Sequence, residues 1–275
     1  MGSFPRSVEL KLSRAAEQAQ ILKNEIDGWT KANPIRYKTE MYKDGMGFRV
    51  IHEGFLNPPP TERWSLIFGE LIHNLRSALD NLAWGLACVK ADPPKKPKII
   101  KFPIIQNRKD FKDEGKPITD QMTQDAAEVI KGMQPFEQSE NNPARNYLVL
   151  LQKFNNEDKH TVPYILFTSF KRFQGLADVE QISDGRKYRI RLEGIPAWDG
   201  REPLHTGTSL VDQPFSEALE PCEVKVYFEL CFSLKIDDKL TPVDFMANFL
   251  VEQINPIVKI FMLYFAAVDS GKHKC

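Results

Sequence analysis

TERWSLIFGELIHNLRSALDNLAWGLACVKA, residues 61–91, is the stretch that decides the fold. Its apolar residues recur at intervals of three and four from Trp64 to Leu86, which predicts an amphipathic helix with one core-facing side. Thr61, which follows three prolines, is a candidate N-cap. At 1.5 Å per residue the helix would be about 45 Å long, so we expect it to be the central element of the fold.

The composition of the chain narrows the class of protein. A chain of 275 residues can form one domain with a large core, and its 37 basic and 37 acidic residues cancel. This balance gives no general charge for binding nucleic acid, so we expect no sequence-specific binding to DNA. Four irregularly spaced cysteines, a polar N-terminus and a charged final helix predict a cytoplasmic protein with reduced thiols and no membrane partner.

The rest of the chain predicts an α+β fold in a single domain, residues 1–275, with a helical core over about 1–170 and a sheet with a closing helix over about 171–268. Alternating polar and apolar residues predict strands, and spacings of three and four predict helices. An apolar residue at every second position, with polar residues between, is typical of an antiparallel sheet. The expected elements are a helix at 8–31, a hairpin at 35–52 that turns at Asp44 and Gly45, helices at 119–133 and from 143, a strand at 224–236, and a helix at 241–268.

A polar stripe on the central helix is the first candidate site. Arg76 and Asp80 are four residues apart and His73 and Asp80 are seven apart, so the three side chains can share one face with Ser77 between them. One interpretation is a structural ion pair within the helix. The other is a functional site, which would need the pair to face the bundle interior.

A second polar cluster ends the helix that is predicted to begin near residue 143. It contains Asn155, Asp158, Lys159 and His160, and a histidine beside an amine and a carboxylate can act as a general acid or base. The alternative is an ordinary polar helix end, where Lys159 and His160 favour the negative end of the dipole. The functional interpretation requires the two clusters to meet in space.

No metal or cofactor site is expected. His73, Asp80, Asp158 and His160 are the possible ligands of a metal site, but their spacing does not place two ligands on one helix turn. The sequence also lacks a phosphate-binding glycine motif and a nucleophile elbow.

Four segments together resemble an uncharacterised bacterial protein family, and the helical core resembles the HEPN superfamily of dimeric nucleases found in toxin and phage-defence systems. The segments are HNLRSALDNLAW (73–84), FPI (102–104), QPF (134–136) and NNEDKH (155–160). The HEPN resemblance implies metal-independent RNA cleavage by an arginine and a histidine a few residues apart on one helix. His160 matches the histidine, but Asn155 stands where the arginine is expected, so Arg76 or Lys159 would have to supply the positive charge.

Two functional hypotheses follow. The first is a metal-independent ribonuclease in which His160 transfers protons, Arg76 and Lys159 hold the phosphate, and Asp80 orients Arg76. Its partners would be RNA and a second copy of the chain. The second is a non-catalytic binding or assembly module that dimerises through its bundle, with Arg76 and His160 in a structural polar clasp.

Overall fold

The computed structural model describes residues 3–139, 142–160, 167–181, 187–191, 204–215, 222–236 and 239–270. Within these ranges, the side chains of residues 158–160, 167–181, 187–191 and 222–230 are not described. The chain divides into two compact units. The helical unit contains Met1–Leu22, Trp64–Tyr164 and Met246–Cys275, and the sheet unit contains Lys23–Arg63 and Ile165–Phe245.

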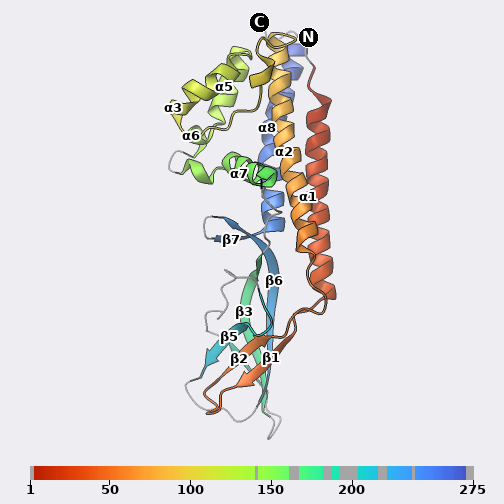
Figure 1. Ribbon diagram of the computed structural model, residues 1–275, viewed down its shortest axis with the longest axis vertical. Helices are drawn as coiled ribbons and strands as arrows, with labels where there is room; N and C mark the ends of the chain where they lie inside the picture. Colours follow the sequence, from red (N-terminus) through yellow and green to blue (C-terminus); the bar gives the residue numbers. More distant parts are fainter. Residues whose placement is uncertain are drawn as a thin grey trace. The chain divides into compact units, whose positions relative to one another are not determined.

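The three long helices are α1 (Arg6–Ala32), α2 (Thr61–Lys90) and α8 (Val243–Asp269) (Figure 1). Residues 6–22, 64–90 and 246–269 of these helices belong to the helical unit. Fifteen residues of α2 are buried, which confirms the predicted central helix and its core-facing side. Gly85 lets α2 approach Pro5 and Phe265, because a Cβ at this position would collide with the Pro5 ring. Phe4 and Phe265 pack edge to face, with ring centroids 5.5 Å apart.

Short elements connect α2 to a longer helix, α7. They are η1 (Pro97–Ile99), α3 (Arg108–Asp110), η2 (Phe111–Gly115), α4 (Lys116–Thr119), α5 (Gln124–Gly132), α6 (Pro135–Gln138) and η3 (Pro143–Arg145), and they lead to α7 (Tyr147–His160). Between η1 and α3 the chain is extended, and residues 102–105 are buried there without joining a sheet. The ring of Phe154 on α7 lies 5.4 Å from that of Phe68, which packs α7 against α2.

Two antiparallel sheets make up most of the sheet unit. One has the strand order β1 (Tyr37–Met41), β2 (Gly47–His52) and β5 (Ser209–Pro214). The other has the order β4 (Lys187–Arg191), β3 (Phe167–Gln181), β6 (Cys222–Ile236) and β7 (Lys239–Pro242). The β1–β2 turn contains Gly45 at φ 72°, a conformation that glycine adopts without strain. The predicted hairpin and antiparallel sheet are confirmed, as is the α+β class.

Some predicted details are wrong. The helix expected from residue 119 begins as α5 at Gln124, because Thr123 accepts a hydrogen bond from the Ala126 amide and caps it. The helix expected from Pro143 begins as α7 at Tyr147, since Pro143 opens only a short 3-10 turn. Ser233 is one of the polar residues that alternate with apolar ones in the predicted strand at 224–236, and it is fully buried rather than exposed.

Acidification below about pH 6.5 should destabilise the sheet unit through His52. The ring is 1% exposed, its Nδ1 lies 3.1 Å from the His205 carbonyl oxygen, and burial lowers its pKa below the ordinary value of 6.5. The unfolded chain therefore takes up this proton at a higher pH than the folded one. The stabilisation is complete above pH 6.5 and is lost as the pH falls from there to the folded pKa.

The urea midpoint of the sheet unit between about pH 7 and about pH 5 measures this effect, since histidine titrates in that range. His52→Gln should flatten the pH dependence, whereas His73→Gln, at an exposed position, should keep it. A wild-type slope that survives His52→Gln would contradict the assignment.

Candidate functional site

The second predicted cluster lies at the end of α7. Asn155 is buried, at 5% exposure, whereas Asn156 and Glu157 are exposed. The backbone of α7 continues to His160, but the side chains of Asp158, Lys159 and His160 lie outside the described residues. Their predicted chemistry therefore stays a prediction.

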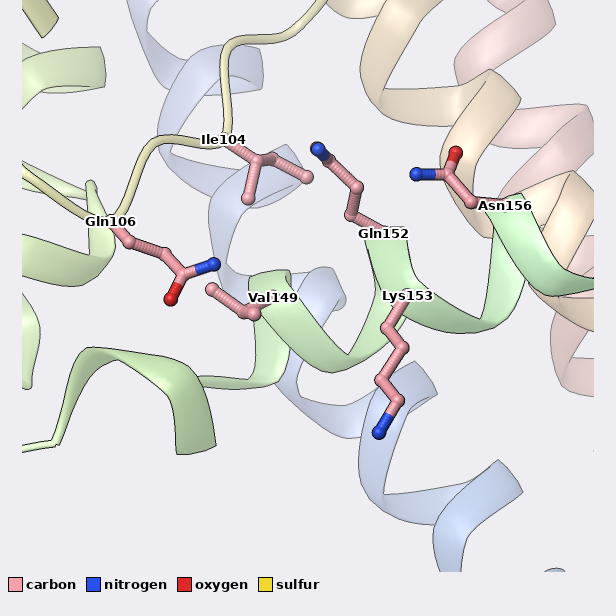
Figure 2. Close-up of a pocket in the computed structure, with 6 residues that line it drawn as sticks. All are labelled: Ile104, Gln106, Val149, Gln152, Lys153 and Asn156. Atoms are coloured by element: carbon pink, nitrogen blue, oxygen red, sulfur yellow. The ribbon is translucent and has the colours of Figure 1, made fainter. Parts of the chain in front are cut away.

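A pocket of about 170 Å³ lies between α7 and the extended segment that follows η1. In Figure 2 the side chains of Gln152 and Asn156 extend upwards from α7 and that of Lys153 extends downwards, and all three line the same pocket. The six lining residues are two aliphatic side chains, three carboxamides and one lysine: Ile104, Val149, Gln106, Gln152, Asn156 and Lys153. The pocket was not predicted from the sequence, because polar residues such as Gln106, Gln152 and Asn156 are common on any solvated surface.

The predicted stripe on α2 divides between solvent and the interior. His73 is exposed, and its Nε2 lies 3.4 Å from the Ser77 hydroxyl. Arg76 is 9% exposed, and its Nη2 donates a 2.8 Å hydrogen bond to Asp80 Oδ1. The structural ion pair expected from the spacing of four is present, and His73 makes no described contact with it.

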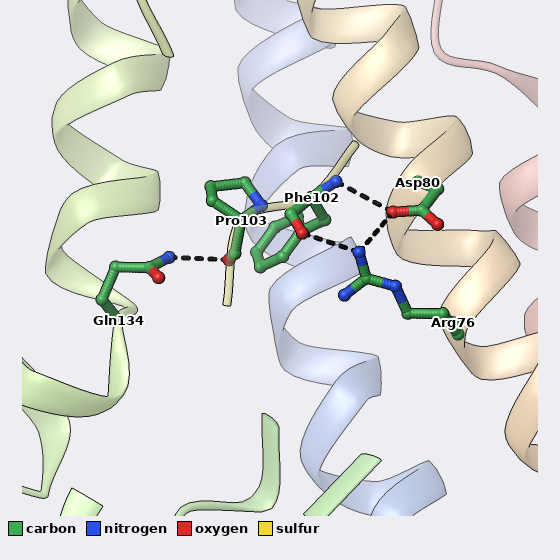
Figure 3. A network of polar contacts seen from close by, with 5 residues as sticks. All are labelled: Arg76, Asp80, Phe102, Pro103 and Gln134. Atoms are coloured by element: carbon green, nitrogen blue, oxygen red, sulfur yellow. Dashed lines mark hydrogen bonds and ion pairs between the residues drawn. The ribbon is translucent and has the colours of Figure 1, made fainter. Parts of the chain in front are cut away.

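Arg76 and Asp80 bind both main-chain groups of a residue far along the chain. Arg76 Nη2 also donates to the Phe102 carbonyl at 2.9 Å, and the Phe102 amide donates to Asp80 Oδ1 at 2.9 Å (Figure 3). Phe102 itself is fully buried. The ion pair thus replaces the hydrogen bonds that a neighbouring strand would otherwise supply to this buried, extended segment.

Gln134 holds the next residues of the same segment from the other side. Its Nε2 donates to the carbonyls of Pro103 and Ile130, each at 3.0 Å, and its Oε1 accepts from the Ile105 amide at 3.0 Å. The side chain is fully buried and makes three hydrogen bonds. We call Arg76, Asp80 and Gln134, with the main chain of residues 102–105, the clasp.

The polar side chains of the clasp bind main-chain groups of their own unit. The Arg76 guanidinium is directed at the protein backbone, and its buried Nη1 has no hydrogen-bond partner among the described residues. The Asp80 side chain is 37% exposed, so the acid faces solvent in part while the arginine does not.

Whether the two predicted clusters meet depends on side chains that are not described. Phe68 and Phe154 bring α2 and α7 into contact, and Phe68 is eight residues, about 12 Å, before Arg76 along α2. The side chain of His160 lies outside the described residues. Within the described part of the chain, no group of three or more His, Cys, Asp or Glu residues could hold a metal ion.

Gln134 and the segment at Phe102 are the residues whose role was not predicted. Their sequence signal is the co-occurrence of FPI and QPF with the helix that contains Arg76, and the clasp joins these three segments by hydrogen bonds. No family model, curated protein or solved structure matches the chain. The clasp and the pocket are thus interpreted from their own geometry.

Proposed function

We propose that the protein is a non-catalytic assembly module whose helical unit forms a homodimer through α8. The observation that carries this proposal is the exposed apolar surface of α8 around Leu263, which is 74% exposed and lies between Ile260 and Met262, at 45% and 38%, on the helix. Large apolar side chains gathered on one surface commonly mark an interaction site. The clasp fits this function, because Arg76 is bound to the backbone of its own unit.

Charge placement on α8 favours a second copy of the chain as the occupant. Lys259 and Asp269 are both exposed, ten residues or about 15 Å apart, and within about a quarter turn of each other. In an antiparallel pair of α8 helices related by a two-fold axis near Tyr264, each Lys259 faces Asp269 of the second copy. Leu263 then lies beside the axis, where the same surface of each copy meets the other and is shielded from solvent.

A lipid bilayer is the competing occupant of the same face. Among the described helices, only α8 is long and apolar enough to cross a membrane, and 33% of its most apolar stretch is buried inside the protein. The exposed Lys259 lies in the middle of this apolar stretch and opposes insertion. The dimer, in contrast, would bury the exposed apolar side chains of α8 and would pair Lys259 with Asp269 of the second copy.

Leu263→Glu should convert a dimer at micromolar concentration into a monomer, because two carboxylates would meet at the axis. Light scattering after size exclusion measures the mass. Leu56→Glu is the matched control, since Leu56 is 69% exposed in the sheet unit and should leave the dimer intact.

Charge exchange on α8 tests the antiparallel pairing itself. Lys259→Asp should weaken the dimer, and adding Asp269→Lys should restore it. A monomeric wild-type protein, or one that floats with liposomes as a monomer, would contradict the proposal.

A metal-independent ribonuclease is the second candidate. The observation that favours it is the position of the pocket on α7: Asn156 lines the pocket, and His160 lies one turn later on the same helix. His160 would exchange protons with the ribose 2′-hydroxyl or the leaving oxygen. Because the clasp engages Arg76, Lys159 would hold the phosphate in place of the arginine.

Incubation with total RNA in the presence of EDTA tests this candidate. His160→Ala should abolish cleavage, and His73→Ala, which removes an exposed histidine of α2, should not. Intact RNA with the wild-type protein, or equal cleavage by wild type and His160→Ala, would eliminate the ribonuclease and leave the assembly module unaffected.

A further inference from the structure

The pocket beside α7 is separate from the self-association face and has the properties of a small binding site. At about 170 Å³ it is below the range of roughly 300–1,000 Å³ that is common for whole ligands. It therefore suits one compact group whose remainder stays in solvent. All six lining residues belong to the helical unit.

The polar groups of the pocket point to the kind of group that it binds. Gln106, Gln152 and Asn156 each offer an N–H donor and a carbonyl acceptor, and none of the three carboxamides makes a side-chain hydrogen bond to another described residue. Figure 2 shows the ends of Gln152 and Asn156 on the same side of α7. Paired donors and acceptors match the edge of a nucleobase, and carboxamides pair with adenine through two hydrogen bonds.

The apolar part of the pocket suits a flat ring. Ile104 is 9% exposed and projects from the extended segment, and Val149 lies on the first turn of α7. Aliphatic side chains of this kind can cover the faces of a base whose edge is bound by polar groups. The segment that carries Ile104 is held in place by the clasp, so this wall of the pocket is anchored.

Charge around the pocket favours an anionic substituent on the ligand. Lys153 is the only charged residue in the lining. The segment 92–116, which contributes Ile104 and Gln106, contains eight basic and four acidic residues, in contrast to the neutral balance of the whole chain. A phosphate that leaves the pocket towards solvent would meet the amine of Lys153 at the rim.

We propose that this pocket binds the base of an adenine nucleotide, with its phosphate at the rim beside Lys153. The carboxamides of Gln106, Gln152 and Asn156 would recognise the base edge. The proposal is independent of the dimer and of any catalysis by His160.

Titration of the full-length protein with AMP, followed by calorimetry, tests the proposal. Asn156→Ala should weaken AMP binding by about tenfold, the loss expected for a carboxamide that makes two hydrogen bonds to a base. Gln124→Ala is the matched control, because Gln124 is an exposed carboxamide on α5 outside the pocket and should leave the affinity unchanged. Equal affinity in wild type and Asn156→Ala would overturn the proposal.

The two halves of the ligand are tested separately. Lys153→Gln should weaken AMP and leave adenosine unchanged, because only AMP has the phosphate. Inorganic phosphate alone should not displace AMP from the wild-type protein at equal concentration. Failure of AMP to bind, displacement by phosphate alone, or binding of single-stranded RNA without binding of AMP would each overturn the proposal.

Discussion

Asp80→Ala should lower the free energy of unfolding of the helical unit by about 2–3 kcal/mol. The substitution leaves the Arg76 guanidinium, which is 9% exposed, without its counter-ion and leaves the Phe102 amide without an acceptor. Loss of one partner of a fully buried pair costs about 3–5 kcal/mol. We expect a smaller effect, because the Asp80 side chain is 37% exposed and water can replace part of it.

Urea unfolding followed by the helical circular dichroism signal measures this loss. Glu17→Ala is the matched control: Glu17 pairs with Arg14 at 2.8 Å, but the two side chains are 59% and 50% exposed. An exposed pair contributes at most about 1 kcal/mol, so this control should be close to wild type. Adding Arg76→Leu to Asp80→Ala should recover part of the stability, because it removes the uncompensated buried charge. Equal losses for Asp80→Ala and Glu17→Ala would mean that the clasp contributes no more than a surface pair.

Gln134→Glu should destabilise the helical unit by about 3 kcal/mol although it changes a single atom of the side chain. The amide nitrogen donates to the carbonyls of Pro103 and Ile130, and a carboxylate oxygen in its place would face both carbonyls without a proton. The remaining oxygen could still accept from the Ile105 amide. The loss therefore reports the two donated hydrogen bonds and the burial of a charge.

The pH dependence of the Gln134→Glu variant distinguishes these causes from a packing defect. Protonation of the new carboxyl restores one donor, so its stability deficit should shrink as the pH falls. Gln138→Glu is the control, because Gln138 is exposed and donates only one hydrogen bond, to Gly132. A deficit that does not change with pH would indicate that the polar network at Gln134 is not the cause.

The long helices could be predicted from the sequence, because burial of one side requires apolar residues at helical spacing. The contact between Arg76 and Asp80 was also predictable, since residues four apart on a helix are neighbours. Their common partner was not. Phe102 lies 22 residues after Asp80 in an extended segment that has no periodicity, and single-sequence patterns do not indicate which main-chain groups lack a strand neighbour.

The candidate site was only partly predictable for a related reason. His73 and Arg76 are three residues apart at the edge of the apolar face of α2, and their spacing does not decide which side chain faces solvent. In the structure His73 is exposed and Arg76 is buried. Gln134 appears in the sequence as a surface residue before a proline, yet it is fully buried and joins two segments. Such residues are identified by the unpaired backbone groups around them, which only a structure reveals.

Amide hydrogen exchange at Phe102 and Ile105 tests the central claim, that Arg76, Asp80 and Gln134 serve to hold residues 102–105. Both amides should exchange slowly in the wild-type protein, because Asp80 and Gln134 bind them directly. In Asp80→Ala, exchange at Phe102 should be faster by at least about tenfold, and in Glu17→Ala it should not change. Exchange at Phe102 that is equally slow in wild type and Asp80→Ala would contradict the account.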